Sequence, residues 1–236
     1  MWYICPQHAV SLRYEGPARN VCPIDGRSYP GWPYDQVIYS RMHDYLAGAA
    51  RDLGLAYRLT GKSQYALTAA ALLRAYADAY SKYPIHDVNN KTATSGARVH
   101  AQTLDESIWL IPIAWAYDLI ADSPALSGSD RVHIEQDLLR AAAAVVDRNR
   151  AGKSNWQSWH NAGVGAVGFA LDDPGIAARV LRDPSNSFDH NYGTLSTNLA
   201  LAPYTALRVN GRSCDFARDG DFILPSECWQ IKNRRR

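Results

Sequence analysis

The sequence has no apolar run that approaches the ~20 residues needed to cross a membrane. It also lacks a strong charge of one sign, because 25 Lys and Arg face 23 Asp and Glu for a net charge of +2. A general nucleic-acid binder would show a larger and more clustered basic excess. The dense basic cluster at 234–236 is explained by a solvated tail. The sequence therefore predicts a globular protein with no membrane span and no nucleic-acid partner.

Cysteine is scarce as well, with four residues in a chain of 236. Two lie near the start and two near the end, at Cys5, Cys22, Cys214 and Cys228, which is unlike a disulfide framework. The first residues lack the basic start and long apolar segment of a signal peptide. The chain also lacks a G-x-S-x-G nucleophile elbow and a phosphate-binding loop. These absences argue against a serine hydrolase and a P-loop enzyme.

Helical periodicity begins only after an irregular start. Residues 1–35 are rich in Pro, Gly, Cys and Tyr and predict a small irregular head. Apolar residues three and four apart then predict helices at 44–59, 62–80, 101–120, 130–146, 155–171 and 174–181. The first two should form an αα-hairpin, Pro112 should kink or break the third helix, and Ser127 should cap the fourth. Residues 36–185 are thus a helical domain and 186–236 an atypical tail, in an all-α fold of antiparallel helix pairs.

Two short Cys-Pro turns in the head have the spacing of a metal site. Cys5-Pro6-Gln7-His8 is followed by Cys22-Pro23-Ile24-Asp25. Each turn can offer two ligands to one tetrahedral ion, and Cys and His are preferred zinc ligands. Cys5, His8, Cys22 and Asp25 are therefore candidate ligands of a structural zinc ion. The alternative is a pair of Cys-Pro turns without a metal.

A long polar loop at 82–98 leads into the aromatic third helix. Asp105 and Glu106 would favour the dipole of its first turn, and Thr103 could cap it. That account leaves three polar groups of a kind that binds an anionic ligand at a helix N-terminus: Arg98, His100 and Gln102. A glycosidase would need two carboxylates across a cleft, and no clear partner for Asp105 or Glu106 is present.

The segment N-W-Q-S-W-H-N at 155–161 places an imidazole, three carboxamides and two indoles in seven residues. A helix that buries the following apolar run at 164–171 must project this cluster from its first turns. His160 has a side chain suited to proton transfer at neutral pH, and a buried His160–Asn161 pair needs partners. Indoles stack on sugar rings, although Trp156 and Trp159 could instead pack the helix and Asn155 could cap it. The combination favours an enzyme that acts on carbohydrate.

Four motifs in order resemble the heparinase II/III-like group, which includes alginate-lyase-type polysaccharide lyases. They are Y-R-L-T-G-K-S-Q-Y-A at 57–66, A-Y-A-D-A-Y-S-K-Y-P-I-H-D at 75–87, G-A-R-V-H-A-Q-T-L-D-E-S-I-W-L-I-P-I-A-W-A-Y-D-L at 96–119 and N-W-Q-S-W-H-N-A at 155–162. The resemblance covers about residues 1–185 and implies an (α/α) toroid, incomplete here, that is usually followed by a β-sandwich. Relatives tend to have Cys where Asp25 stands, and they are often periplasmic or secreted.

The implied reaction is β-elimination of a uronic-acid-containing polysaccharide, without a cofactor for catalysis. By the resemblance, His160 acts as base or charge neutraliser and Asn161 holds the uronate carboxylate. The implied substrate-binding residues are Asn155, Trp156, Gln157, Trp159, Arg98 and Gln102. The tyrosine acid common in such lyases has no matching motif here, because neither Tyr192 nor Tyr204 sits in one.

The tail after Asp183 departs from the pattern of the relatives, which continue with further toroid helices. A truncated or frame-shifted product would explain this departure, and such a chain could be an inactive fragment. A non-catalytic carbohydrate-binding or helical-repeat scaffold protein is the alternative, since αα-hairpins also build repeat proteins with concave binding faces.

Overall fold

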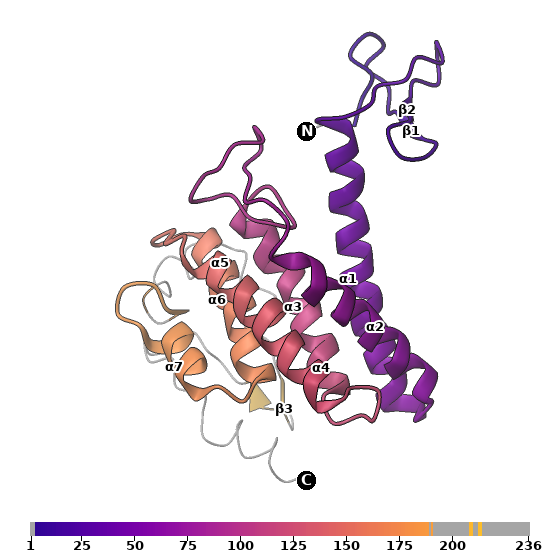
Figure 1. Ribbon diagram of the computed structural model, residues 1–236. Coiled ribbons are helices and arrows are strands. Elements are labelled where there is room, and N and C mark those ends of the chain that lie inside the picture. The colour runs from indigo at the N-terminus through magenta and orange to yellow at the C-terminus, as the bar shows by residue number, and fades with distance from the viewer. Residues whose placement is uncertain (1–2, 189, 191–207, 210–211, 214–236) are drawn as a thin grey trace.

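The computed structural model describes residues 3–188 and 190, and the backbone of 208–209 and 212–213. Its described part is mostly helical, which confirms the predicted all-α class (Figure 1). The helices are α1 (Tyr34–Thr60), α2 (Ser63–Tyr80), α3 (Thr103–Ile120), α4 (Gly128–His133), the π-helix η1 (Ile134–Arg140), α5 (Ala141–Asp147), α6 (Asn155–Ala170) and α7 (Pro174–Arg182). Two antiparallel strand pairs accompany them, β1 (Arg13–Tyr14) with β2 (Asn20–Val21) and β3 (Arg208–Val209) with β4 (Arg212–Ser213). None of the described helices is long and apolar enough to cross a membrane.

Helices α1 and α2 form the predicted αα-hairpin. Gly61 ends α1 in the left-handed conformation, at φ 69°, and its N–H donates to the carbonyl of Tyr57. α1 begins ten residues before the predicted start at Asp44. Asp35 accounts for the early start, because its carboxylate lies in the first turn and accepts from the backbone N–H of Gly31 (2.8 Å) and the amide of Asn20 (2.7 Å). The apolar period is weak there because little of this end of α1 is buried.

Helix α3 is the centre of the helical body. It packs against α1, α2, α5 and α6, and most of its apolar side chains are buried, whereas Ile108 and Trp115 are exposed. Its largest enclosed side chain is Trp109, stacked 6.1 Å from the ring of Tyr80. Pro112, which was predicted to kink or break this helix, does not break it, since α3 continues through that residue.

The predicted helix at 130–146 is present as three consecutive segments, α4, η1 and α5. Ser127 caps it as predicted, in a capping box in which its hydroxyl accepts from the N–H of Asp130 and the Asp130 carboxylate accepts from the N–H of Ser127. The π-helical middle widens the turn, and such turns cannot be read from a period of 3.6 residues.

Three glycines let α6 approach its neighbours closely. Gly163, Gly165 and Gly168 have the G-x-G-x-x-G spacing of dinucleotide-binding turns, but they lie inside a helix rather than between a strand and a helix. A Cβ atom at Gly163 would lie 2.8 Å from the carbonyl oxygen of Ser107 in α3, and one at Gly168 would lie 2.8 Å from Cγ2 of Ile176 in α7. The glycines therefore serve helix packing.

Gly163→Ala is expected to lower the free energy of unfolding by about 1–3 kcal/mol, because the added methyl group must push α3 and α6 apart. Gly48→Ala is the matched control, since a Cβ atom there meets nothing within 4 Å and Ala is the better helix former by about 1 kcal/mol. Urea unfolding of both variants measures the difference. Equal stability of the two variants would contradict the close packing of α3 on α6.

The head has a small core of its own. Cys5, Leu12 and Cys22 are buried together, with Tyr29 and Tyr34 packed against them, and this cluster is separate from the core of the helical body. Figure 1 shows the head at the N-terminal end of α1, away from α3 to α7. The predicted tail at 186–236 lies mostly outside the described residues.

Candidate functional site

The segment 155–161 forms the first two turns of α6, as the sequence predicted. Ser154 caps the helix, because its hydroxyl accepts from the N–H of Gln157 at 3.2 Å. The side chain of Asn155 therefore does not cap the helix and is exposed. Trp159 is also exposed at 38 %, whereas Trp156 is half-buried. Asn155 and Trp159 are free to meet a ligand at the protein surface.

His160 points into the protein and is only 1 % exposed. Its ring meets the indole of Trp156 edge to face, with centroids 6.2 Å apart. Within the described residues, neither ring nitrogen makes a hydrogen bond of good geometry. Burial lowers the pKa of His160 to about 4, against smaller opposing effects of the Asn149 backbone and the Asp147 carboxylate. The imidazole is therefore neutral at neutral pH and has a lone pair available for a proton.

Gln157 and Asn161 lie beside His160 and bind each other. The amide nitrogen of Gln157 donates to Oδ1 of Asn161 at 3.0 Å, and its oxygen accepts from the N–H of Ala151 at 2.9 Å. The amide nitrogen of Asn161 donates to the carbonyl of Asn186 at 2.7 Å. These two amides are thus engaged with the chain on both sides of α6, and Asn161 is only 5 % exposed. The structure brings the predicted pair together in an enclosed position.

Arg98 and Gln102 donate hydrogen bonds to residues outside α6. The guanidinium of Arg98 donates to the carbonyls of Ser81 (2.9 Å) and Tyr83 and lies over the ring of Tyr80. The amide of Gln102 donates to Asp105 at 2.7 Å. The hydrogen bonds of Arg98 therefore connect the end of the long loop to the residues that follow α2. Their assignment as substrate-binding residues stays a prediction.

Glu106 is a residue whose importance the sequence concealed. Glu106 lies in the first turn of α3, as the sequence predicted, but its side chain is fully buried. One carboxylate oxygen accepts from the hydroxyl of Tyr80 (2.7 Å), and the other accepts from the backbone N–H groups of Val99 (3.0 Å) and His100 (2.9 Å). Burial raises the pKa of Glu106, and these donors oppose the rise. Thr103, expected to cap, is instead a buried first residue of α3 that accepts from Asn149.

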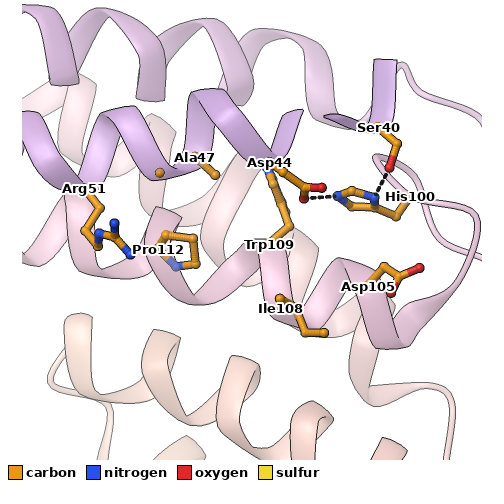
Figure 2. A pocket seen from close by; sticks show the side chains of 10 residues that line it. Ser40, Asp44, Ala47, Arg51, His100, Asp105, Ile108, Trp109 and Pro112 are labelled. Atoms are coloured by element: carbon orange, nitrogen blue, oxygen red, sulfur yellow. Dashed lines mark hydrogen bonds and ion pairs between the residues drawn. The ribbon is translucent and has the colours of Figure 1, made fainter. Parts of the chain in front are cut away.

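His100 lines a cavity of about 450 Å³ between α1 and α3 (Figure 2). The ring is 3 % exposed, with Nδ1 2.9 Å from the hydroxyl of Ser40 and Nε2 3.2 Å from Oδ1 of Asp44. His100 is therefore held by groups that are sixty and fifty-six positions earlier in the chain, and spacing alone could not reveal them.

The head gathers three of the four predicted metal ligands. The ligand atoms of Cys5, His8 and Cys22 all lie within 4.8 Å of one another. Nδ1 of His8 is 3.5 Å from Sγ of Cys5 and 3.4 Å from Sγ of Cys22. Asp25 is outside this group, with Oδ2 3.8 Å from His8 Nδ1 and Oδ1 accepting from the N–H of Arg27. Two sulfurs and one imidazole are a donor set that suits zinc.

The surroundings of Cys5 lower the pKa of its thiol. Burial opposes the charged form, but the hydroxyl of Tyr29 and the backbone N–H groups of Gln7 and His8 outweigh it and lower the pKa of Cys5 to about 6. Burial raises the pKa of the neighbouring Cys22 thiol. A thiolate is the form that binds a metal, so the cluster can offer one charged sulfur at neutral pH.

Comparison with known proteins agrees with the resemblance in part. The family model described as alginate lyase matches residues 19–191. An alginate lyase of Stenotrophomonas maltophilia is 32% identical over 145 residues, which are 60% of this chain and 19% of that protein. An exo-oligoalginate lyase of Saccharophagus degradans is 32% identical over 127 residues, 52% of this chain and 17% of that protein. The chain therefore matches less than a fifth of the length of these relatives. Because the family model covers most of the sequence, the chain belongs to the alginate lyase family.

Proposed function

We propose that this chain is part of a polysaccharide lyase that cleaves a uronic-acid-containing polysaccharide by β-elimination. The observation that carries the proposal is the buried His160, a neutral imidazole beside two carboxamides in a member of the alginate lyase family. We also propose that the described helices belong to an (α/α) toroid of the heparinase II/III-like kind. The relatives named as alginate lyases support alginate as the first substrate to test.

The reaction removes the proton next to the uronate carboxylate and then expels the glycosidic oxygen, which takes up a proton from water. His160 takes the proton, because its depressed pKa keeps the ring unprotonated. Negative charge builds on the carboxylate, and an amide donor stabilises it. Asn161 supplies that donor by exchanging its bond to the carbonyl of Asn186 for the substrate. Gln157 holds Asn161 in place, and the exposed Asn155 and Trp159, with Trp156, face the sugar chain.

An absorbance assay for the unsaturated uronate product tests this proposal. The full chain is incubated separately with alginate, heparan sulfate and other uronic-acid polysaccharides. Product absorbance that grows with time on at least one of them is the expected result. A flat trace on all of them, with protein whose circular dichroism shows folded helices, would refute turnover by this chain.

A non-catalytic carbohydrate-binding protein is the second candidate, and the enclosure of His160 and Asn161 favours it. A binding protein needs no open route to an imidazole, and the exposed Trp159 offers a stacking surface for sugar rings. Calorimetric titration with alginate oligosaccharides separates the two candidates. Binding without any unsaturated product supports this second function.

We propose a structural zinc ion in the head, bound by Cys5, His8 and Cys22, with Asp25 or a water molecule as fourth ligand. Elemental analysis of the purified chain is expected to find about one zinc ion per chain. Cys22→Ser should abolish binding, because it removes one of three clustered ligands. Asp25→Ala should retain zinc with weaker affinity, since Asp25 lies outside the cluster. Zinc-free protein after purification without chelators would contradict the site.

A further inference from the structure

The groove between α1 and α3 is built from one face of each helix. Ser40 and Asp44 are four residues apart on α1, and Asp44 and Arg51 are seven residues apart, so the three side chains share a face. Asp105, Trp109 and Pro112 form the facing row on α3. Between Asp44 and Arg51 the wall is made of Ala47 and Gly48, which leave the space open. The cavity of about 450 Å³ falls in the range of small-molecule sites.

His100 closes one end of the groove with a fixed orientation. Its backbone N–H is bound by the buried Glu106, and its ring nitrogens lie between Ser40 and Asp44 (Figure 2). The carboxylate beside Nε2 favours a proton on that nitrogen, with Nδ1 accepting from Ser40. At 3.2 Å the Nε2–Asp44 contact lacks hydrogen-bond alignment, so this buried nitrogen has an unused donor. A small turn of the exposed Asp44 carboxylate would satisfy this donor, so His100 positions Asp44 at the end of the groove.

The groove also offers one cation and several acceptors. Arg51 uses Nε and Nη2 on its neighbour Asp52 and keeps further N–H groups, since a guanidinium has five. Asp44 is largely exposed, and Asp105 has one oxygen not engaged by Gln102. Because Pro112 has no N–H, the carbonyl of Ile108 loses its helical donor on the groove side of α3. One cation, surrounded by oxygens that can accept hydrogen bonds from hydroxyl groups, fits a sugar that carries one carboxylate.

We propose that the α1–α3 groove binds a uronic-acid residue of the polysaccharide, separately from the His160–Asn161 pair. Arg51 binds the carboxylate, and Asp44 and Asp105 accept hydrogen bonds from the ring hydroxyls, while the enclosed ring of His100 holds Asp44 at the end of the groove. The inference rests on the proposed function for its substrate class and adds a second place where the chain holds the polymer. Such a subsite secures the substrate while the reacting bond lies elsewhere.

Calorimetric titration of the full chain tests the groove. The ligands are trimannuronate and the same trisaccharide with its carboxylates reduced to alcohols. Arg51→Gln is expected to weaken binding of trimannuronate about tenfold, the effect of losing one charge-assisted hydrogen bond. The reduced trisaccharide should bind wild type and Arg51→Gln equally. Arg41→Gln is the matched control, because Arg41 is an exposed arginine of α1 that lines a different hollow.

Each titration is repeated in His160→Ala, so that no ligand is consumed and binding is read apart from turnover. Loss of affinity in Arg51→Gln with no lyase activity in any sample would support the groove and refute the proposed turnover. Lyase activity with equal affinities of Arg51→Gln and Arg41→Gln would refute the groove and leave the proposed function intact. No binding of trimannuronate by the wild-type chain also overturns the groove.

Discussion

His160→Ala is expected to lower the rate of uronate elimination by about 10²–10⁴-fold, the usual contribution of a positioned acid–base group. The loss should appear in kcat, because the imidazole acts in the chemical step, in which it removes the proton next to the uronate carboxylate. His160→Gln should lose as much, since an amide is no base. The absorbance assay for unsaturated product measures both variants. His133→Ala is the control, because His133 is a partly exposed histidine paired with Asp78 and Asp137 on another part of the surface.

The pH profile gives a second reading of the same residue. With the pKa of His160 lowered to about 4, the neutral base persists well below the ordinary titration range of histidine, near pH 6.5. The acid limb of kcat/KM should therefore fall near pH 4 rather than near pH 6.5. Unchanged kcat in His160→Gln, or an acid limb that survives in that variant, would remove His160 from the role of base.

Glu106→Ala is expected to destabilise the fold by about 3–5 kcal/mol, because three hydrogen-bond donors lose their buried acceptor. The change leaves the Tyr80 hydroxyl and the N–H groups of Val99 and His100 without an acceptor, and each unpaired group costs about 1–3 kcal/mol. Glu106→Gln should be less destabilising, because its oxygen can still accept from the two backbone N–H groups while its NH₂ group donates to the hydroxyl oxygen of Tyr80. Urea unfolding measures both.

Glu135→Ala is the matched control for Glu106→Ala. Glu135 also accepts from a tyrosine, Tyr117, but it is only partly buried and receives no backbone N–H in the described structure. Its loss should cost about 1 kcal/mol. If the two alanine variants unfold at the same urea concentration, the long loop does not depend on Glu106 for its attachment.

The sequence predicted the helical body well because apolar periodicity reports burial along one helix. The start of α6 at Asn155, the hairpin turn at Gly61 and the cap at Ser127 all follow from local chemistry. The early start of α1 was missed because it depends on Asn20 of the head reaching Asp35. The π-helical turn in η1 was missed because it interrupts the period itself.

The candidate site was predictable in its residues but not in its surroundings. The side chains of His160, Asn161 and Gln157 come together as neighbours on one helix. Their enclosure depends on Ala151 and Asn186, which join from before and after the helix. Glu106 is enclosed by Tyr80 of α2 and the backbone that follows the long loop, and His100 by residues of α1. Burial by residues that are distant in the sequence cannot be predicted from local residue spacing.

The head joins the helices at the first turn of α1 and keeps its own small core. Among the described residues, the bonds of Asp35 and the packing of Tyr34 connect the two sides of this junction. Mutations within the head can therefore accumulate without any compensating change among the buried residues around α3. Over evolutionary time, a unit attached in this way can be lost, exchanged or fused elsewhere while the helical body keeps its sequence.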